Sequence, residues 1–329
     1  MKWLNHELYI EPIDCYIDPG RPVKRAIITH GHADHARAGH GHVLATPQTI
    51  DIMRARYGAQ CAGHFQCLPF GEPLKIDDVK VTLYPAGHIL GSAQVCLEYD
   101  GQRAVITGDY KTHADNTAQR FELIQCDLFV TEATFGLPVF QHPKPQSEIR
   151  RLLASIATKT DRCHVIGAYA LGKAQRIIKL LREAGYDAPI YLHGAQDKLC
   201  AYYTSQGVQL GDLRKALDSE KDNFRGHVVI APPSALRDRW SRRLPDPVVC
   251  YASGWMTIKQ RAKQSGVELP LVISDHADWN ELTETITATG AQTIWVTHGR
   301  EDALVHWCRQ RGLDAEPLYL QGREEDSSE

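Results

Sequence analysis

"THGHADHARAGH", residues 29–40, places four histidines and one aspartate within twelve residues, directly after a short apolar run. In a tight loop after a strand, the alternate residues His30 and His32 can point to one side. Asp34 and His35 can then reach a second point a few ångströms away. Neutral imidazoles and a carboxylate suit zinc, manganese or iron, and a catalytic ion also needs one open position. The stretch therefore predicts a site for two metal ions, which four protein groups alone cannot complete.

Further polar residues with metal-ligand chemistry follow predicted strands along the chain. They are Asp18, His88, Asp109, Glu132, His276 and His298. In α/β proteins, sites form at the carboxyl ends of strands, because the loops converge there while the sheet stays rigid. We expect His88, Asp109 and His298 to complete the metal sites, with the two oxygens of Asp109 able to bridge them.

Other residues in the same part of the chain are expected to carry no chemistry. His40 and His42 lie beyond the cluster in the glycine-rich stretch "AGHGH", which predicts a surface loop that binds no metal. The nine cysteines are scattered without a C-x-x-C pair, and several lie in strand-like apolar surroundings. They are expected to be reduced structural thiols.

The pattern of short runs indicates an α/β protein. Residues 46–58 predict a helix that begins at a threonine cap and a proline and ends at a glycine. Residues 74–88 and 92–110 predict two hairpins, the second turned at Asp100-Gly101. From about residue 142 the pattern changes to strand, loop and helix, which is typical of a parallel sheet.

Composition limits the class of protein. With 329 residues, 43% of them hydrophobic, the chain can bury a substantial core. No window approaches a membrane span and no signal peptide is evident, so we expect a cytoplasmic protein without membrane contact. The formal net charge of -3 provides no global attraction to a polyanion, so any nucleic-acid contact must come from local basic patches.

The motifs resemble those of a known family. H-x-H-x-D-H, "PAGHILGSAQV", "TGDY" and "VTHG" resemble the successive metal motifs of the metallo-β-lactamase fold, and "YIDP" around Asp18 resembles the motif before them. "TEATFG", "SDHADW" and "VTHG" resemble motifs A, B and C of the β-CASP nucleases. "FGLPVF", "AYALGKAQRI", "APPSA" and "YASGWM" narrow the resemblance to bacterial proteins labelled DNA-ligase-associated exonucleases.

This resemblance covers nearly the whole chain and implies a domain order. The metallo-β-lactamase domain, a βαβ-type sandwich with αββα layers, would occupy residues 1–141 and 265–320. A β-CASP domain would be inserted at 142–264, where the strand pattern changes. Residues 321–329 are acidic and polar, and we expect a disordered tail there.

The resemblance also implies roles for the site residues. One divalent ion, manganese or zinc, would be held by His30, His32 and His88, and a second by Asp34, His35 and His298. Asp109 would join them, and Asp18 would orient the ligands through hydrogen bonds. Such a pair of ions would activate a water molecule for phosphodiester hydrolysis, with Asp34 and Asp109 in the catalytic centre. His276 would protonate the leaving oxygen while Glu132 orients its ring.

The implied activity is that of a DNA nuclease in repair. Single-stranded DNA cut internally is the expected substrate, with functional links to an ATP-dependent DNA ligase and a helicase. Two sets of residues are candidate contacts for it: a basic set with one aromatic ring and a pair of serines in tight turns. They are Lys173, Arg176, Arg237, Arg239 and Trp240, and Ser234 and Ser253.

Three alternatives remain open from the sequence. Histidine at motif C is typical of RNA-processing β-CASP enzymes, so an RNA nuclease is the second hypothesis. A third is a DNA-binding scaffold of a repair complex without catalysis, which the intact ligands and the acid candidate disfavour. A small-molecule hydrolase shares the first domain's motifs, but not the insert or the Glu132 and His276 pair.

Overall fold

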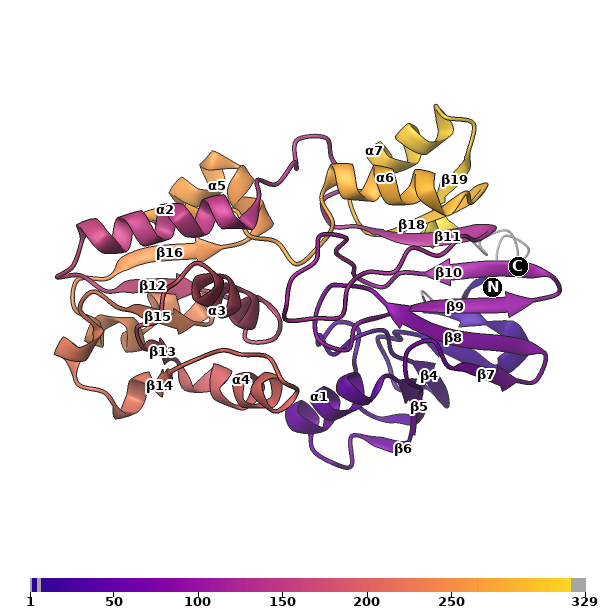
Figure 1. Ribbon diagram of the computed structural model, residues 1–329. Coiled ribbons are helices and arrows are strands. Elements are labelled where there is room, and N and C mark those ends of the chain that lie inside the picture. The colour runs from indigo at the N-terminus through magenta and orange to yellow at the C-terminus, as the bar shows by residue number, and fades with distance from the viewer. Residues whose placement is uncertain (1, 5–6, 265, 321–329) are drawn as a thin grey trace. The chain divides into compact units, whose positions relative to one another are not determined.

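The computed structural model describes residues 2–4, 7–264 and 266–320, which form two compact units. Unit 1 contains the described residues up to Pro138 and those from His276 onward, and unit 2 is Val139–Asp275 (Figure 1). The predicted insert, 142–264, lies within unit 2, which extends beyond it at both ends. The predicted acidic tail, 321–329, lies outside the described residues.

Unit 1 contains two sheets. The first comprises, in spatial order, β1 (Lys2–Leu4), β2 (Glu7–Ile10), β3 (Cys15–Ile17), β4 (Arg25–Ile27), β5 (His40–Ala45) and β6 (Ala62–Cys67). The second comprises β19 (Asp314–Pro317), β18 (Thr293–Gly299), β11 (Leu128–Ala133), β10 (Gln102–Ile106), β9 (Ala93–Tyr99), β8 (Val79–Pro85) and β7 (Pro73–Ile76). Strand β18 runs parallel to β11, so the C-terminal segment extends a sheet begun by the N-terminal part.

Helices cover the outer faces of these two sheets. They are α1 (Pro47–Tyr57), α6 (Trp279–Thr289) and α7 (Glu301–Arg309). Unit 1 also has two short 3-10 turns, η1 (Glu11–Ile13) and η7 (Leu318–Leu320). Ile27 and Leu83 pack in the core between the sheets. Met53 of α1 packs on the other face of the first sheet, and Leu282 of α6 and Leu304 of α7 pack on the other face of the second. Unit 1 therefore has helix, sheet, sheet and helix layers.

Local sequence explains the elements that lead to the site. As predicted, α1 begins at the cap Thr46, whose hydroxyl accepts from the amide of Thr49, and it ends at Gly58. The predicted hairpins are also confirmed: β7 pairs antiparallel with β8, and β9 with β10. Asp100 and Gly101 both have positive φ, 50° and 75°, as a tight two-residue turn requires.

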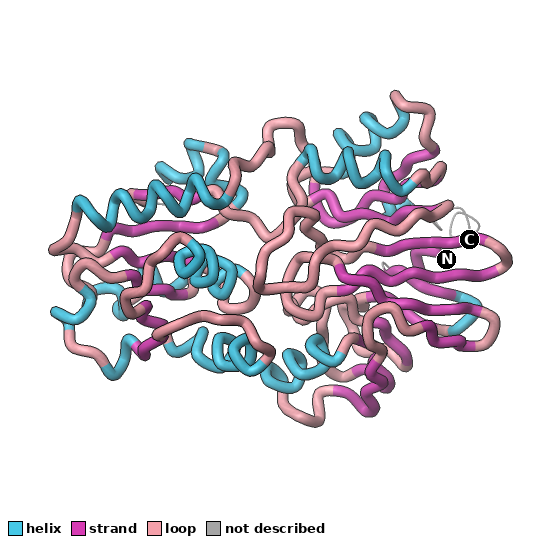
Figure 2. Tube along the Cα trace, in the orientation of Figure 1, coloured by secondary structure: helices cyan, strands magenta, loops and turns pink. Residues whose placement is uncertain are grey.

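Unit 2 contains the predicted parallel sheet. Its strands, in spatial order, are β14 (Leu213–Lys215), β13 (Ile190–Leu192), β15 (Val228–Ala231), β12 (His164–Gly167), β16 (Val248–Ala252) and β17 (Leu269–Leu271). The α-helices are α2 (Pro145–Thr158), α3 (Lys173–Glu183), α4 (Gly194–Ser205) and α5 (Lys259–Gln264), and five 3-10 turns lie between residues 216 and 257 (Figure 2). Every residue of β12 and β15 is buried, because a parallel sheet covered on both faces exposes neither. In the part of the chain that the structure describes, no helix is long and apolar enough to cross a membrane.

The prediction that His40 and His42 lie in a surface loop was wrong. Both lie in strand β5 and not in a surface loop. His40 is buried, and its Nδ1 accepts a hydrogen bond from the amide of Val23 at 3.3 Å, while His42 stays exposed. The glycines on either side misled the interpretation, because Gly41 is a strand residue: a side chain there would meet the Lys24 carbonyl at 2.7 Å. The glycine permits close approach of two strands.

Candidate metal centre

Three imidazoles and one carboxylate converge at the carboxyl ends of β4, β8 and β10. His32 Nδ1 lies 3.1 Å from His30 Nε2 and 3.0 Å from His88 Nε2. Asp109 Oδ2 lies 3.5 Å from His30 Nε2 and 3.7 Å from His88 Nε2. Four ligands at about 2.1 Å from a tetrahedral ion are separated by about 3.4 Å, so this set has the spacing and the donor chemistry of a zinc or manganese site.

A second group shares Asp109. His35 Nε2 lies 3.4 Å from Asp109 Oδ2, and His298 Nδ1 lies 3.8 Å from Asp109 Oδ1. Asp34 is further out: its Oδ2 is 4.0 Å from His35 Nε2, and its side chain is 78% exposed. Asp109 therefore faces both groups: its Oδ2 lies 3.4 to 3.7 Å from nitrogens of His30, His88 and His35, and its Oδ1 lies 3.8 Å from His298 Nδ1.

The pKa values of His30 and Asp109 favour the protonation states that bind a cation. Burial, and then the neighbouring His35, lower the pKa of the His30 imidazole well below its usual value, so this ring is neutral and its nitrogen can bind a metal. Burial alone would raise the pKa of Asp109, but His35 and His276 hold the pKa of that carboxyl well below its usual range. Asp109 thus stays ionised although it is buried.

Asp18 orients this arrangement from behind. Its Oδ2 lies 2.7 Å from His35 Nδ1, and its Oδ1 accepts from the Thr29 amide at 2.7 Å. With Nδ1 facing Asp18, the other ring nitrogen of His35, Nε2, faces Asp109. Burial lowers the pKa of His35, but the Asp109 and Asp18 carboxylates outweigh it and raise that pKa well above its usual value. Asp18 and Asp109 together thus make His35 a strongly basic nitrogen, as carboxylate partners do for metal-binding histidines.

His276 and Glu132 form a pair beside the first group. His276 Nδ1 lies 3.0 Å from Glu132 Oε2 and 3.2 Å from Oε1, and the buried Glu132 Oε1 also accepts from the Tyr110 amide at 2.7 Å. The same nitrogen is 3.9 Å from Asp109 Oδ2, and the His276 and His88 ring centroids are 4.6 Å apart. Nδ1 therefore faces Glu132, and Nε2 is the other nitrogen of the ring.

Two predicted substrate contacts have another use within unit 2. The Lys173 ammonium donates to Asp275 Oδ1 at 2.6 Å and to the Ile273 carbonyl at 3.0 Å. Arg176 Nη1 donates to the Ser274 carbonyl at 2.6 Å. Both side chains are buried, and their donors hold the segment that directly precedes His276. Contact of either side chain with a phosphate backbone stays a prediction, and the donors named here already bind the chain.

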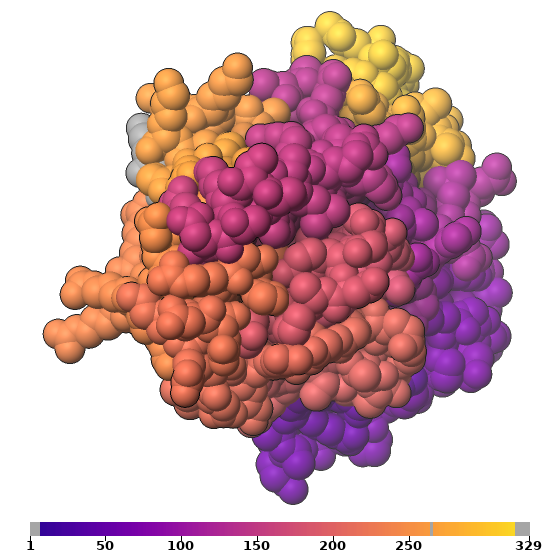
Figure 3. Space-filling model, turned by 60° about the vertical axis from the view of Figure 1, so that its left-hand side comes forward, coloured from indigo at the N-terminus to yellow at the C-terminus, as the bar shows by residue number. Residues whose placement is uncertain are grey.

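The remaining candidate contacts also lie in unit 2. Ser253 is buried, and its hydroxyl accepts from the Trp255 amide at 3.3 Å as the cap of η6 (Gly254–Thr257). Ser234 is exposed on η4 (Pro233–Arg237). Arg237 and Arg239 are exposed there and on the following turn η5 (Arg239–Arg243), whereas Trp240 is partly buried against the core and meets His193 edge-on at 4.8 Å. Long side chains from this orange part of the chain project from the surface in Figure 3.

Some residues that shape the site have no motif. Arg56 on α1 donates from Nη1 to the Gly31 carbonyl at 2.5 Å, between the ligands His30 and His32. Glu281 on α6 accepts bonds from the segment that follows Asp109. In the sequence both are ordinary charged helix residues, and only folding brings them to the site.

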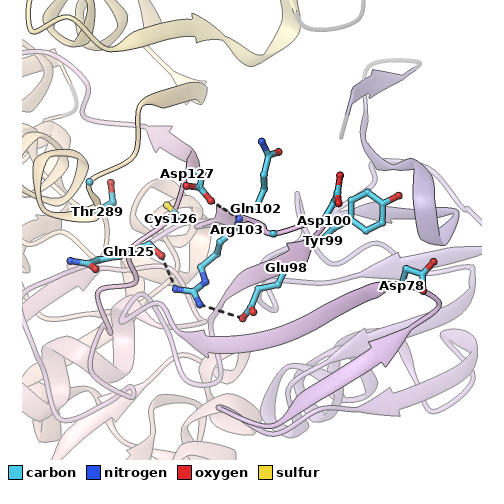
Figure 4. Close-up of a pocket in the computed structure, with 12 residues that line it drawn as sticks. Asp78, Glu98, Tyr99, Asp100, Gln102, Arg103, Gln125, Cys126, Asp127 and Thr289 are labelled. Atoms are coloured by element: carbon cyan, nitrogen blue, oxygen red, sulfur yellow. Dashed lines mark hydrogen bonds and ion pairs between the residues drawn. The ribbon is translucent and has the colours of Figure 1, made fainter.

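One pocket of unit 1 lies elsewhere (Figure 4). Its volume is about 620 Å³, and it is lined by the β9–β10 turn together with Gln125, Asp127 and Thr289. Arg103 in it is 3.7 Å from Glu98 and donates to the Gln125 carbonyl at 3.2 Å. Strand β10 begins at this pocket, whereas Asp109 follows the strand's other end, so the pocket is separate from the metal centre.

The chain is similar in sequence to several named proteins. A protein named "Probable DNA ligase" of Opitutus terrae is 32% identical over 323 residues, which are 96% of this chain and 31% of that protein. The "RNase J-like protein" of Methanocaldococcus jannaschii is 27% identical over 68% of this chain and 62% of its own length. The "Endoribonuclease YSH1" of Yarrowia lipolytica is 24% identical over 83% of this chain and 43% of its own. The chain belongs to the β-CASP metallo-β-lactamase family.

Two further comparisons, with family models and with solved structures, complete this picture. No family model matches the chain. A solved structure of a protein of unknown function from Enterococcus faecalis superposes with a TM-score of 0.59, at 13% identity, and covers 83% of this chain and 75% of that one. The chain spans about a third of the length of the Opitutus relative and less than two thirds of the other two. In the sequence, the histidine motifs of unit 1 lie on both sides of the segment that forms the parallel strands of unit 2.

Proposed function

We propose that this β-CASP chain is a metal-dependent nuclease with a metallo-β-lactamase fold in unit 1 and a β-CASP insert in unit 2. The observation that carries the proposal is the convergence of five histidines on Asp109, with the His276 and Glu132 pair beside it. In this proposal His30, His32, His88 and Asp109 hold one divalent cation. Asp34, His35, His298 and Asp109 hold the second, manganese or zinc.

The cations supply a low-pKa water and a positive charge for a phosphoryl oxygen. The chain supplies the remaining chemistry. His276, held at Nδ1 by Glu132, gives the proton on Nε2 to the leaving oxygen of the phosphodiester. Glu132 fixes the ring and favours its protonated form, since a carboxylate beside an imidazole stabilises the positive charge. Asp18 keeps the His35 ring in place through the contact at Nδ1.

DNA is the proposed substrate, in single-stranded form and with internal cuts. The Opitutus relative named as a probable DNA ligase supports this choice, because a stretch similar to nearly the whole of this chain forms part of it. Because a stretch similar to this chain is part of a protein named as a probable DNA ligase, we propose that the chain works in DNA repair beside an ATP-dependent ligase. A helicase would supply the single-stranded DNA. Arg237, Arg239 and Trp240 are proposed to hold the strand, by phosphate contacts and by stacking on one base.

RNA cleavage is the second candidate. The relatives named as an RNase J-like protein and as an endoribonuclease favour it. The deciding experiment uses metal-stripped protein with manganese, zinc or magnesium on circular and linear single-stranded DNA, duplex DNA and RNA. Cleavage of the circle supports an internal cut in DNA, and cleavage of RNA alone overturns the choice of DNA. Tight DNA binding without hydrolysis under any metal would favour a scaffold instead.

A further inference from the structure

A buried carboxylate on α6 joins two segments of the metal centre. Glu281 is 2% exposed and lies in the first turn of the helix. Its Oε1 accepts from the Thr112 amide at 3.1 Å, the Thr112 hydroxyl at 2.7 Å, the His113 amide at 3.0 Å and His113 Nδ1 at 2.8 Å. Its Oε2 forms a buried ion pair with Lys111 and accepts from the Asp278 amide at 3.1 Å.

The two segments carry the reacting groups. Lys111 follows Asp109 by two residues, and the cap residue Asp278 follows His276 by two. Between them, the Ala277 amide donates to the Tyr110 carbonyl at 2.7 Å, and the Tyr110 amide donates to Glu132. A short series of hydrogen bonds therefore joins the segment after Asp109 to the segment after His276, and Glu281 binds the last residues of both.

We propose that Glu281 and Lys111 are positioning residues that hold the His276 ring against Glu132 beside the metal loop. This inference rests on the proposed role of His276 as the proton donor. The contacts described above join Glu281 and Lys111 to the two segments and not to the proposed metal ligands, so each residue acts through the backbone of these segments. The site thus has a support that neither the metal motifs nor motifs A, B and C contain.

The charge on Glu281 makes this support rigid. Burial alone would raise the pKa of the carboxyl, but Lys111 and His113 hold that pKa well below its usual range, so the group is ionised. If Glu281 loses a hydrogen-bond donor, its buried negative charge is no longer fully compensated. The two segments must then shift to bring another donor to the carboxylate. A displacement of about 1 Å at a proton donor lowers a rate about 100-fold, although nothing that touches the substrate has changed.

The kinetic test uses two substrates that differ in their need for a proton donor. When a DNA phosphodiester is cut, the leaving group is a strongly basic sugar alkoxide, which needs a proton. Bis(4-nitrophenyl) phosphate instead releases a weakly basic phenolate, which needs none. We expect Glu281→Gln to lower kcat for DNA about 10- to 100-fold, with KM and metal content unchanged and hydrolysis of the nitrophenyl ester within about threefold of wild type. Equal losses with both substrates, or no loss with DNA, would overturn the proposal.

Two further variants separate positioning from general damage. Leu282→Ala removes a fully buried apolar side chain of the same helix, which makes none of the hydrogen bonds described for Glu281, and serves as the control for loss of thermal stability. It should not change the ratio of the two rates. Thr112→Val removes one donor to Glu281 at nearly constant volume. It should change the ratio in the same direction by a smaller factor, and it tests the proposal even where Glu281→Gln does not fold.

A structural readout needs neither metal nor substrate. In metal-free protein labelled with ¹⁵N-histidine, the proton on His276 Nδ1 should be protected from exchange by Glu132, and His276→Ala identifies its signal. We expect that signal to persist in Leu282→Ala and to broaden or vanish in Glu281→Gln; persistence in both would overturn the proposal. If His276→Ala itself slows both substrates equally, the proton-donor role in the proposed function fails, and the Nδ1 signal still decides whether Glu281 positions the ring.

Discussion

Gly299, directly after His298, is the position where one added methyl group should disturb the metal centre most. Its φ is +144°, and a Cβ there would lie 2.1 Å from the Ala133 carbonyl oxygen and 2.8 Å from the Thr134 amide nitrogen. That carbonyl already accepts from the amides of Gly136 and Arg300. Gly299→Ala must therefore push the end of β18 away from β11, and His298 moves with it.

The size of the effect follows from two terms. A side chain held in this backbone region costs about 1–3 kcal/mol. Crowding against main-chain atoms, which cannot turn aside as a side chain can, adds about 1–3 kcal/mol. We expect Gly299→Ala to lower the free energy of unfolding by about 2–6 kcal/mol. Because His298 is displaced from Asp109, the second cation should also bind more weakly.

The matched control is Gly290→Ala at the end of α6. Gly290 also has positive φ, 70°, but nothing lies within 4 Å of its would-be Cβ, so only backbone strain of about 1–2 kcal/mol is expected. Urea unfolding gives the two free energies, and equilibrium dialysis with zinc gives the bound metal. If Gly299→Ala proves as stable as Gly290→Ala and binds as much metal as wild type, the clash does not govern the position of His298.

Three other changes have distinct expected results. His276→Gln should lower DNA cleavage about 10²- to 10⁴-fold at unchanged metal content, and normal turnover would remove the proton-donor role. Asp18→Asn should weaken metal binding about 10- to 100-fold by calorimetry, and unaltered affinity would show that His35 needs no carboxylate partner. Burial, with Lys159 and Arg162 nearby, lowers the pKa of His164 from 6.5 to about 4, so the unfolded chain binds the extra proton first. The free energy of unfolding should therefore be greatest above pH 6.5 and fall as the pH drops toward 4. In His164→Gln, urea unfolding should no longer show this part of the pH dependence. The same slope of unfolding free energy against pH in both proteins would contradict the prediction.

The sequence predicted the elements whose signals are local. The α1 cap with its terminal glycine and the Asp100-Gly101 turn are confirmed, because each depends on neighbouring residues. The parallel sheet of unit 2 is also confirmed, because its strands alternate with helices along the chain, which is the pattern of a parallel sheet. The candidate metal-ligating residues could be selected because H-x-H-x-D-H lies within one loop and its distant partners each follow a strand. Convergence on Asp109 is a geometric fact that the sequence only suggested.

Residues that act across the fold could not be predicted. Lys173 and Arg176 had the composition of a phosphate site, but their partners, about 100 residues away in the chain, hold them inside unit 2. His40 was misplaced because a glycine-rich stretch predicts a loop unless the close approach of a neighbouring strand is known. Glu281 carries no motif, and its role depends on a segment about 170 residues earlier.

Cation dependence of DNA cleavage tests the assignment of the Asp109 cluster most directly. Metal-stripped protein is mixed with circular single-stranded DNA, with and without added manganese or zinc, beside Asp109→Ala under the same conditions. We expect no cutting without metal, linear product when metal is restored, and no product from Asp109→Ala at any metal concentration. Cutting in the presence of chelator, or by Asp109→Ala, would contradict the assignment of this cluster as the reaction centre.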